Sequence, residues 1–325
     1  MTLRGIETLL YGVDDLDTSI RFYTDFGLTI AEQDAGGVRF ELPEGSSFIL
    51  RQRDDPTLPP PFLDGQGPRE VIWGVDTADD LKAIAENLRR DREVSTDADG
   101  TLHTVDDSGI HIGFRVFARR DLGATGAPTE NNLSQVSRWN QHRKWYERAQ
   151  PKLINHVVFG VPDVDRGVAF YVDRLGFRVT DIMRGLGMFM RCDGRHDHHN
   201  LFVFRGGRLF FSHVSFGVET IDELMIGANR MQREGWTSEV GLGRHRISSL
   251  VFFYMNSPAG GQTEYSADSD YLDDAWTPRM WDPEFGQHHW LAQLPQNSNI
   301  ATQGVAEPVV GPRPKLNETI RPKPQ

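Results

Sequence analysis

The feature that most constrains the fold of this chain is an internal repeat. Residues 6–28 (IETLLYGVDDLDTSIRFYTDFGL) resemble residues 154–177 (INHVVFGVPDVDRGVAFYVDRLGF). In both stretches an alternating apolar segment passes through Gly-Val and an acidic turn into a segment with Phe-Tyr, which predicts a strand followed by a helix. The matching pairs are Ile6 and Ile154, Gly12 and Gly160, Val13 and Val161, Asp15 and Asp163, Asp17 and Asp165, Phe22 and Phe170, and Tyr23 and Tyr171.

The repeat continues further along each half of the chain. Residues 70–92 pair with residues 213–235, again as a strand, an acidic turn and a helix. Residues 106–114 pair more weakly with residues 257–265. Each half therefore reads as a tandem of strand–helix–strands units, and the predicted fold is α+β, with two modules of paired βαβββ units.

Composition places the boundaries between these modules. An N-terminal module is expected over 1–118, a linker over 119–152, a C-terminal module over 153–300 and an extended or disordered tail over 301–325. The linker contains LGATGAPTENNLSQ, which is rich in Gly, Pro and small polar residues, and a connecting helix is expected within it over 136–149. The tail has many prolines and no hydrophobic period.

Charge and cysteine content exclude several function classes. The formal net charge of -11 argues against a nucleic-acid partner. No apolar run approaches the ~18 residues of a membrane span. Cys192 is the only cysteine, so it cannot form an intramolecular disulfide, and a buried apolar role is expected for it rather than a nucleophilic one. A cytoplasmic protein that binds neither nucleic acid nor membrane is expected.

Three potential metal ligands occur in the second half only. At matching positions of the two halves stand His156 and Thr8, His213 and Glu70, and Glu264 and Gly113. A single His on an apolar strand is usually a satisfied core residue, but three ligand types at matching strand positions are a stronger signal. Two imidazoles and one carboxylate make the facial triad of non-heme Fe(II) oxygenases, which leaves coordination positions open for substrate and dioxygen. Fe(II) or Mn(II) suits these ligands, and Zn(II) is possible.

A resemblance to a known family rests on a longer motif near the C-terminus. The segment GRHRISSLVFFYMNSPAGGQTE is similar to the signature of type I extradiol ring-cleaving dioxygenases, in the vicinal oxygen chelate superfamily. The matching residues are Gly243, His245, Phe253, Tyr254, Pro258, Gly260 and Glu264. The sequence departs from the signature at Ser257, where the family usually has an acidic, amide, Thr or Ala residue. The resemblance in organisation covers about residues 5–295.

The resemblance implies both the fold and the chemistry. It implies a glyoxalase-like fold whose second module holds Fe(II), with Mn(II) possible, on His156, His213 and Glu264. The substrates would be a catecholic small molecule and O2, and the ring would open beside the two hydroxyls. His199 would act as the acid and base, Tyr254 would hydrogen-bond the substrate, and His245 would support either the substrate or Tyr254. A homo-oligomer is implied as well.

The remaining His and aromatic residues receive weaker expectations. The stretch GRHDHHNLF (194–202) resembles a metal site when read alone, but only His199 is assigned a role there. His196 and His198 are expected to face solvent or the pocket rim. Weaker candidates are His288 and His289, and Trp276 and Arg279 are candidates to line the substrate pocket.

Three alternative functions stay open on the same scaffold. A 4-hydroxyphenylpyruvate dioxygenase type of enzyme would share the triad but would need a 2-oxo acid substrate. A glyoxalase-type isomerase usually takes ligands from both modules, which Thr8 and Glu70 do not favour. A binding protein that sequesters a small molecule would need no triad. The identity of the catechol, and proximal or distal cleavage, are not predicted.

Overall fold

The computed structural model describes residues 1–123, 130–292 and 306–320, and its first module consists of two βαβββ units. The elements of this module are β1 (Leu3–Val13), α1 (Leu16–Phe26), β2 (Thr29–Gln33), β3 (Gly37–Glu41), β4 (Ser47–Gln52), β5 (Gly67–Val75), α2 (Ala78–Leu88), β6 (Ser95–Thr96), β7 (Leu102–Val105) and β8 (His111–Val116). They form one sheet in the order β2-β3-β4-β1-β5-β8-β7-β6. The two units meet at the antiparallel pair of β1 and β5.

The second module repeats this plan and adds strands at both edges of its sheet. Its elements are β9 (Leu153–Val161), α3 (Val164–Ala169), the π-helix η1 (Phe170–Arg174), β10 (Arg178–Met183), β11 (Gly187–Arg191), β12 (Leu201–Arg205), β13 (Phe210–Gly217), α4 (Ile221–Arg233), β14 (Gly243–His245), β15 (Val251–Asn256), β16 (Gln262–Ala267), β17 (Arg279–Trp281), the 3₁₀ helix η2 (Pro283–Phe285), β18 (His288–Leu291), β19 (Glu307–Pro308) and the 3₁₀ helix η3 (Leu316–Thr319). The sheet order is β18-β14-β15-β16-β13-β9-β12-β11-β10-β17-β19. The predicted α+β fold with tandem βαβββ units is therefore confirmed.

The helices begin at equivalent residues in the two modules. The side chains of Asp15 and Asp163 each accept a hydrogen bond from the backbone N–H three residues later, at the start of α1 and α3. Thr77 and Thr220 do the same at the start of α2 and α4. Such N-caps satisfy an otherwise unpaired N–H and stabilise a helix by about 1 kcal/mol. The acidic turns of the sequence repeat are therefore helix caps.

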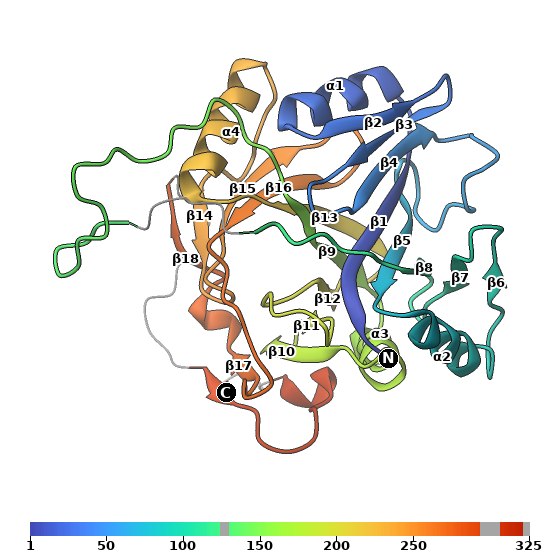
Figure 1. Cartoon of the computed structure of the whole chain (residues 1–325). Helices are drawn as coiled ribbons and strands as arrows, with labels where there is room; N and C mark the ends of the chain where they lie inside the picture. The colour runs from blue at the N-terminus through green and yellow to red at the C-terminus, as the bar shows by residue number, and fades with distance from the viewer. Residues whose placement is uncertain (124–129, 293–305, 321–325) are drawn as a thin grey trace.

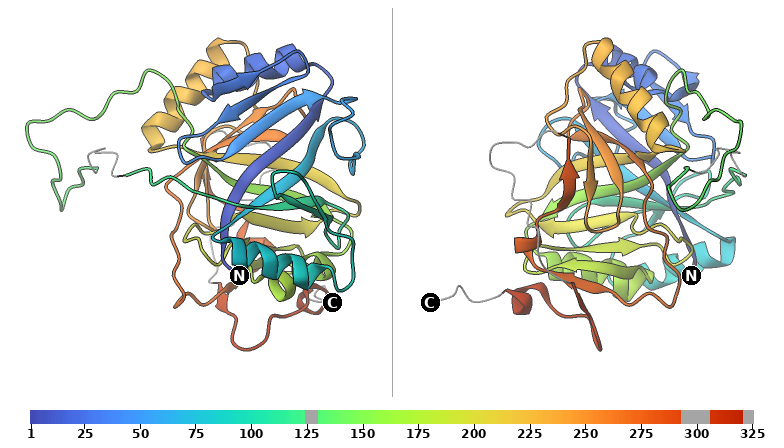
Figure 2. Two further views of the ribbon diagram at one scale, coloured as in Figure 1. Left: turned by 45° about the vertical axis from the view of Figure 1, so that its right-hand side comes forward. Right: turned by 90° about the vertical axis from the view of Figure 1, so that its left-hand side faces the viewer.

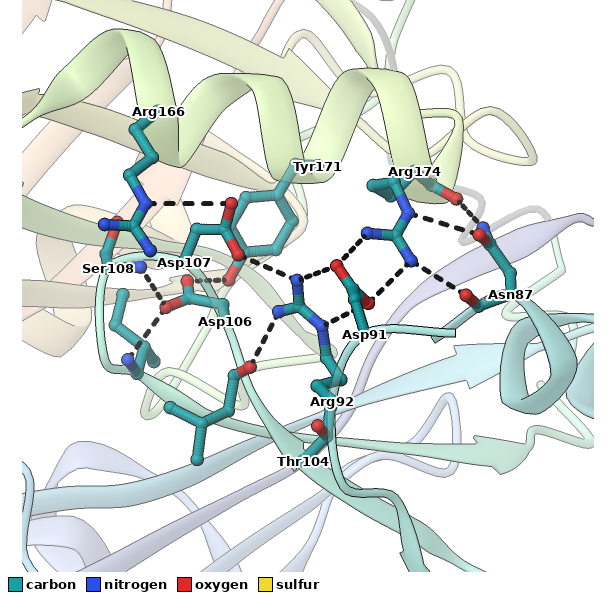
Figure 3. A network of polar contacts seen from close by, with 12 residues as sticks. Asn87, Asp91, Arg92, Thr104, Asp106, Asp107, Ser108, Arg166, Tyr171 and Arg174 are labelled. Carbon is teal, nitrogen blue, oxygen red and sulfur yellow. Dashed lines mark hydrogen bonds and ion pairs between the residues drawn. The ribbon is translucent and has the colours of Figure 1, made fainter. Parts of the chain in front are cut away.

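One hydrophobic core runs through both modules. Helices α1 and α4 lie together at one end of the molecule, and α2 and α3 lie together at the other end (Figure 1). The two repeated tyrosines link the modules. The hydroxyl of Tyr171 donates to Asp106 of the first module at 2.9 Å (Figure 3), and the hydroxyl of Tyr23 lies 3.2 Å from Ser257 of the second module. Asp106 and Ser257 are themselves matching positions of the repeat, so these two contacts are related by the duplication.

A network of charged residues reinforces the contact at the α2 end of the molecule. The guanidinium of Arg174, in η1, bonds both carboxylate oxygens of Asp91 and the backbone oxygen of Asn87 (Figure 3). Arg92 bridges Asp91 and Asp107 in the same network. Because these residues come from both modules, the network joins the end of α2 to the η1 helix.

The connecting segment differs from the sequence expectation. Residues 130–142 form a largely exposed arm without helix, and residues 143–148 return along the start of α4, where Arg143 pairs with Asp222 and Lys144 with Glu219 (Figure 1, Figure 2), whereas a helix was expected over 136–149. Trp139 and Trp145 are 76% and 84% exposed, so the indole rings that such a helix would need to bury do not pack on the body. Isolated helices of this length are marginal in water without such packing, which explains the absence of a helix.

The described part of the C-terminal tail also differs from the expected extended or disordered arm. Strand β19 pairs with β17, and Leu316 is buried. The backbone N–H of Leu316 donates to Asp165, which lies in the first turn of α3. Residues 306–320 therefore pack on the second module because Leu316 supplies an apolar anchor, and the remaining tail residues lie outside the described part.

Within the described residues, no helix has the length and hydropathy to span a membrane.

Candidate metal centre

Strand pairing brings the three candidate ligands onto one face of the second sheet. His156, His213 and Glu264 lie on β9, β13 and β16, which are neighbours in the sheet. Ser215 of β13 is paired with His156 on one side and with Glu264 on the other. His213 precedes Ser215 by two residues, and alternate residues of a strand share a face. The three side chains therefore converge on one point.

The distances between the ligand atoms are short. The two Nε2 atoms of His156 and His213 are 3.3 Å apart. The Oε2 atom of Glu264 lies 3.2 Å from Nε2 of His156 and 3.8 Å from Nε2 of His213. All three ligand atoms lie within 4.8 Å of one another. His156 and Glu264 are buried, and the His213 side chain is partly exposed.

The environment of Glu264 fits a bound cation. Its side chain is fully buried, and neither carboxylate oxygen has a hydrogen-bond partner among the described residues. Burial alone would raise the pKa of Glu264, but the imidazoles of His156 and His213 outweigh it and lower the pKa to about 2. Burial also lowers the pKa of His213 to about 3, so its imidazole is neutral. A buried carboxylate whose oxygens accept no hydrogen bond is costly, and two imidazoles with one carboxylate are ligands for Fe, Mn or Zn.

A tight turn places Glu264. The β15–β16 connection contains Gly260, four residues before Glu264, with a φ of +97°. A Cβ at Gly260 would lie 2.8 Å from the backbone oxygen of Gln66. Glycine is needed here both for its left-handed conformation and for the close approach of the two modules.

The matching face of the first module has the same geometry with different chemistry. Ile72 is paired with Thr8 and Gly113, as Ser215 is paired with His156 and Glu264. The positions matched by sequence are therefore structurally equivalent. Glu70, the counterpart of His213, lies 2.7 Å from Nδ1 of His103. This hydrogen bond to Glu70 raises the pKa of His103 to about 9, so the first module holds an ion pair at this place.

A cavity of about 370 Å³ opens beside the three candidate ligands. His199, His245 and Tyr254 line it together with His156 and His213. The apolar part of its wall consists of Val158, Met183, Leu186, Phe189, Phe202, Phe204, Val240 and Ile247. The remaining lining residues are Ser212, Ser248, Gln262, Gln287 and His288. The cavity is therefore mostly apolar, with imidazole and phenol groups gathered near the candidate ligands.

The three residues expected to assist chemistry all lie beside the triad. The ring of His199 packs 4.1 Å, centroid to centroid, from that of His156. Burial lowers the pKa of His199 well below its usual value, so its imidazole is neutral. Tyr254 pairs with Glu264 across β15 and β16, and its hydroxyl lies 3.2 Å from Nε2 of His245. Burial raises the pKa of Tyr254 and lowers that of His245 to about 4, so both groups are uncharged.

Three other expectations are wrong. His198 does not face solvent: it is buried, and its Nε2 lies 2.9 Å from Asp181. Trp276 and Arg279 do not line this cavity, because Trp276 Nε1 donates to the backbone oxygen of Thr180 and the Arg279 guanidinium stacks on the Trp276 ring. His288, a weaker candidate, does line it.

The other histidines of the sequence clusters behave as expected, and so does the cysteine. His196 and His289 are exposed and do not line the cavity. Cys192 is buried, and burial raises its thiol pKa well above the usual value. The apolar wall was missed because Phe189 and Phe202 follow ordinary strand patterns. Only their pairing across β11 and β12 brings them together at the cavity.

Comparison with known proteins finds a superfamily match within the second module. Residues 153–265 match the Glyoxalase/Bleomycin resistance protein/Dioxygenase superfamily. Metapyrocatechase 2 of Cupriavidus necator is 32% identical over 156 residues, which cover 47% of this chain and 49% of that protein. The chain thus matches about half the length of this curated relative.

Solved structures extend the likeness of fold to nearly the whole chain. BphC, a halotolerant catechol dioxygenase, has a TM-score of 0.71 at 16% identity and covers 92% of this chain and 98% of its own. The Mn(II)-bound glyoxalase from Novosphingobium aromaticivorans has a TM-score of 0.69 at 21% identity, and the match covers 97% of this chain and 96% of that chain. Residues 153–265 are therefore similar to the Glyoxalase/Bleomycin resistance protein/Dioxygenase superfamily, and the chain shares the fold of the catechol dioxygenase BphC over most of its length.

Proposed function

We propose that this chain is an Fe(II)-dependent extradiol dioxygenase that cleaves a catecholic ring with O2. The observation that carries the proposal is the convergence of His156, His213 and Glu264 at the wall of an apolar cavity that also holds uncharged His199 and Tyr254. Similarity to Metapyrocatechase 2 of Cupriavidus necator and to an iron-dependent extradiol dioxygenase of Rhodococcus jostii supports the same reaction.

The three ligands fit a divalent ion, with Fe(II) proposed and Mn(II) possible. The ligand atoms come from neighbouring strands and lie on one side of the point where they converge. The other side faces the cavity, since His156 and His213 both line it. When bound, iron would supply open positions for both catechol oxygens and for O2, and a path for electron density between the two reactants.

The surrounding side chains would move and hold protons. A catechol must lose protons as it reacts, and the neutral imidazole of His199 is positioned at the cavity wall to accept one. The Tyr254 hydroxyl would donate its single hydrogen to a substrate oxygen, and His245, whose Nε2 lies 3.2 Å away, would donate to that hydroxyl and orient it. The apolar wall would exclude bulk water from the reacting groups.

The cavity lining also restricts the substrate. Among its described lining residues there is no Lys or Arg, and its apolar wall includes Met183, Phe189 and Phe204. A carboxylated catechol, or the 2-oxo acid of a 4-hydroxyphenylpyruvate dioxygenase type of enzyme, would bring an unpaired anion into this wall at high cost. We therefore favour a catechol with an uncharged apolar substituent, such as an alkyl or aryl group.

Reconstitution tests the proposal directly. The chain is loaded with Fe(II) without oxygen and mixed in air with catechol, 3-methylcatechol, 2,3-dihydroxybiphenyl and the carboxylated 3,4-dihydroxybenzoate. We expect yellow ring-opened products from the uncharged catechols and little from the carboxylated one. Glu264→Gln, which keeps the shape of the ligand, should give no product, and His196→Gln, at an exposed histidine, should act like the wild type. Absence of product from every catechol would refute the proposal.

A further inference from the structure

A buried series of three hydrogen-bonded side chains leads from the cavity into the second module. Asp181 of β10, His198 and His199 are all buried, the most exposed at 6%. The Nδ1 atoms of His198 and His199 are 3.0 Å apart. On the opposite side of its ring, His198 places Nε2 at 2.9 Å from Oδ2 of Asp181. His199 alone of the three lines the cavity.

When His198 and His199 are neutral, the hydrogen-bond donors and acceptors of these three side chains allow only one placement of the ring protons. An ionised carboxylate only accepts hydrogen bonds, so Nε2 of His198 carries the proton that bonds Asp181. The Nδ1 atom of His198 then has a lone pair, and Nδ1 of His199 must donate to it. The Nε2 atom of His199, on the other side of its ring, is consequently unprotonated and free to accept a proton from a molecule in the cavity.

We propose that Asp181 and His198 are positioning residues that hold His199 in its Nδ1–H tautomer, with Nε2 as the proton acceptor of the cavity. The inference rests on the proposed function, because it assigns His199 its working form in ring cleavage. It explains why a second histidine of the sequence cluster is fully buried beside a carboxylate. The ring of Phe189 packs edge-on against both imidazoles and limits their rotation.

Asp181→Asn is the most informative variant, because the second oxygen of this carboxylate already accepts another hydrogen bond. The Oδ1 atom of Asp181 accepts the backbone N–H of Arg279 at 2.9 Å. In the variant the amide oxygen must keep this contact, so the amide NH2 faces His198. Nε2 of His198 must then accept, its Nδ1 must donate to His199, and the tautomer of His199 is reversed. The variant changes no side-chain volume, so the packing of the module is preserved.

The tautomers can be measured without metal or substrate. In the metal-free full chain with ¹⁵N-labelled histidine, long-range ¹H–¹⁵N spectra identify which ring nitrogen carries hydrogen, and the His199→Asn variant assigns the His199 signals. We expect the Nδ1–H form of His199 in the wild type and the Nε2–H form in Asp181→Asn. An Nε2–H form of His199 in the wild type, or an unchanged form in Asp181→Asn, would overturn the inference.

Kinetics of the Fe(II)-loaded chain supply the second readout. Asp181→Asn should lower kcat by roughly 10²–10⁴-fold with bound iron and catechol KM nearly unchanged, as expected for loss of a proton acceptor. The matched control is Asp106→Asn, another buried carboxylate that lies at the module interface and should keep the wild-type kcat. Wild-type kcat in Asp181→Asn would contradict the inference.

A second variant covers the case in which Asp181→Asn does not fold. His198→Phe fills the same space but removes both hydrogen bonds, and kcat should again fall while iron stays bound. Full activity of His198→Phe would contradict the inference. A wild-type chain that cleaves no catechol would refute the proposed function alone, because the tautomer measurement is independent of turnover.

Discussion

The buried carboxylate at the module interface makes a quantitative prediction about stability. Asp106 is 5% exposed and accepts hydrogen bonds from the Tyr171 hydroxyl and from the backbone N–H groups of Ser108 and Ile110. Burial raises the pKa of Asp106 from its ordinary 3.8 to about 6, despite these three donors. The folded chain therefore binds the proton more tightly than the unfolded chain does.

The sign of the pH dependence follows from this difference. Between about pH 4 and pH 6 the folded state holds more protons, so the free energy of unfolding falls as the pH rises through this window. One pH unit corresponds to about 1.4 kcal/mol, so the complete effect is about 3 kcal/mol, of which about 2 kcal/mol falls between pH 4 and pH 7. Asp106→Asn removes this titration. It also leaves the Tyr171 hydroxyl without its charged acceptor, a loss of about 1–3 kcal/mol that does not depend on pH.

Urea unfolding of the wild type and of Asp106→Asn at several pH values from 4 to 7.5 measures the effect. The variant should gain about 2 kcal/mol relative to the wild type as the pH rises across this range. All other titrating groups are common to both chains and cancel in the difference. A difference that stays constant with pH, or that moves in favour of the wild type, would refute the reasoning.

Three further predictions concern the candidate metal centre. Glu264→Ala should abolish Fe(II) binding, measured by metal analysis, while circular dichroism stays native, because Gly113 occupies the matching place in the first module; retention of a full equivalent of iron would contradict it. His199→Phe should keep iron but lower kcat by roughly 10²–10⁴-fold, whereas loss of iron would mark His199 as a ligand. Metal at about 100 times its Kd should stabilise the wild type by about 2.7 kcal/mol in a thermal or urea assay. Equal stabilisation of Glu264→Ala would show that the ion binds elsewhere.

The fold could be predicted from the sequence because the duplication is visible in it. Two copies of the same pattern report strands and helices more securely than one, and the strand period of two indicates which residues share a face. The strand register of the structure then shows that the positions matched by sequence are equivalent. Ile72 stands between Thr8 and Gly113 just as Ser215 stands between His156 and Glu264.

Features that depend on non-local partners could not be predicted. The sequence did not reveal that His198 is buried, because its partner Asp181 lies on β10 while His198 lies in the β11–β12 connection, and no local pattern links the two. The helix expected over 136–149 is absent because Trp139 and Trp145 have no surface on which to bury their rings. The order of residues 306–320 depends on Leu316 reaching a surface beside α3, which composition alone does not indicate.

The central claim is that His156, His213 and Glu264 hold a metal that supports ring opening by O2. Mass spectrometry of the product formed from 2,3-dihydroxybiphenyl by the Fe(II)-loaded chain under ¹⁸O₂, with fragmentation to locate the cleaved bond, tests it most directly. The account predicts a ring-opened product with the mass of the substrate plus one labelled O2, cleaved beside the two hydroxyls, and none of it from Glu264→Gln. Cleavage between the hydroxyls, or the same product at wild-type yield from Glu264→Gln, would contradict it.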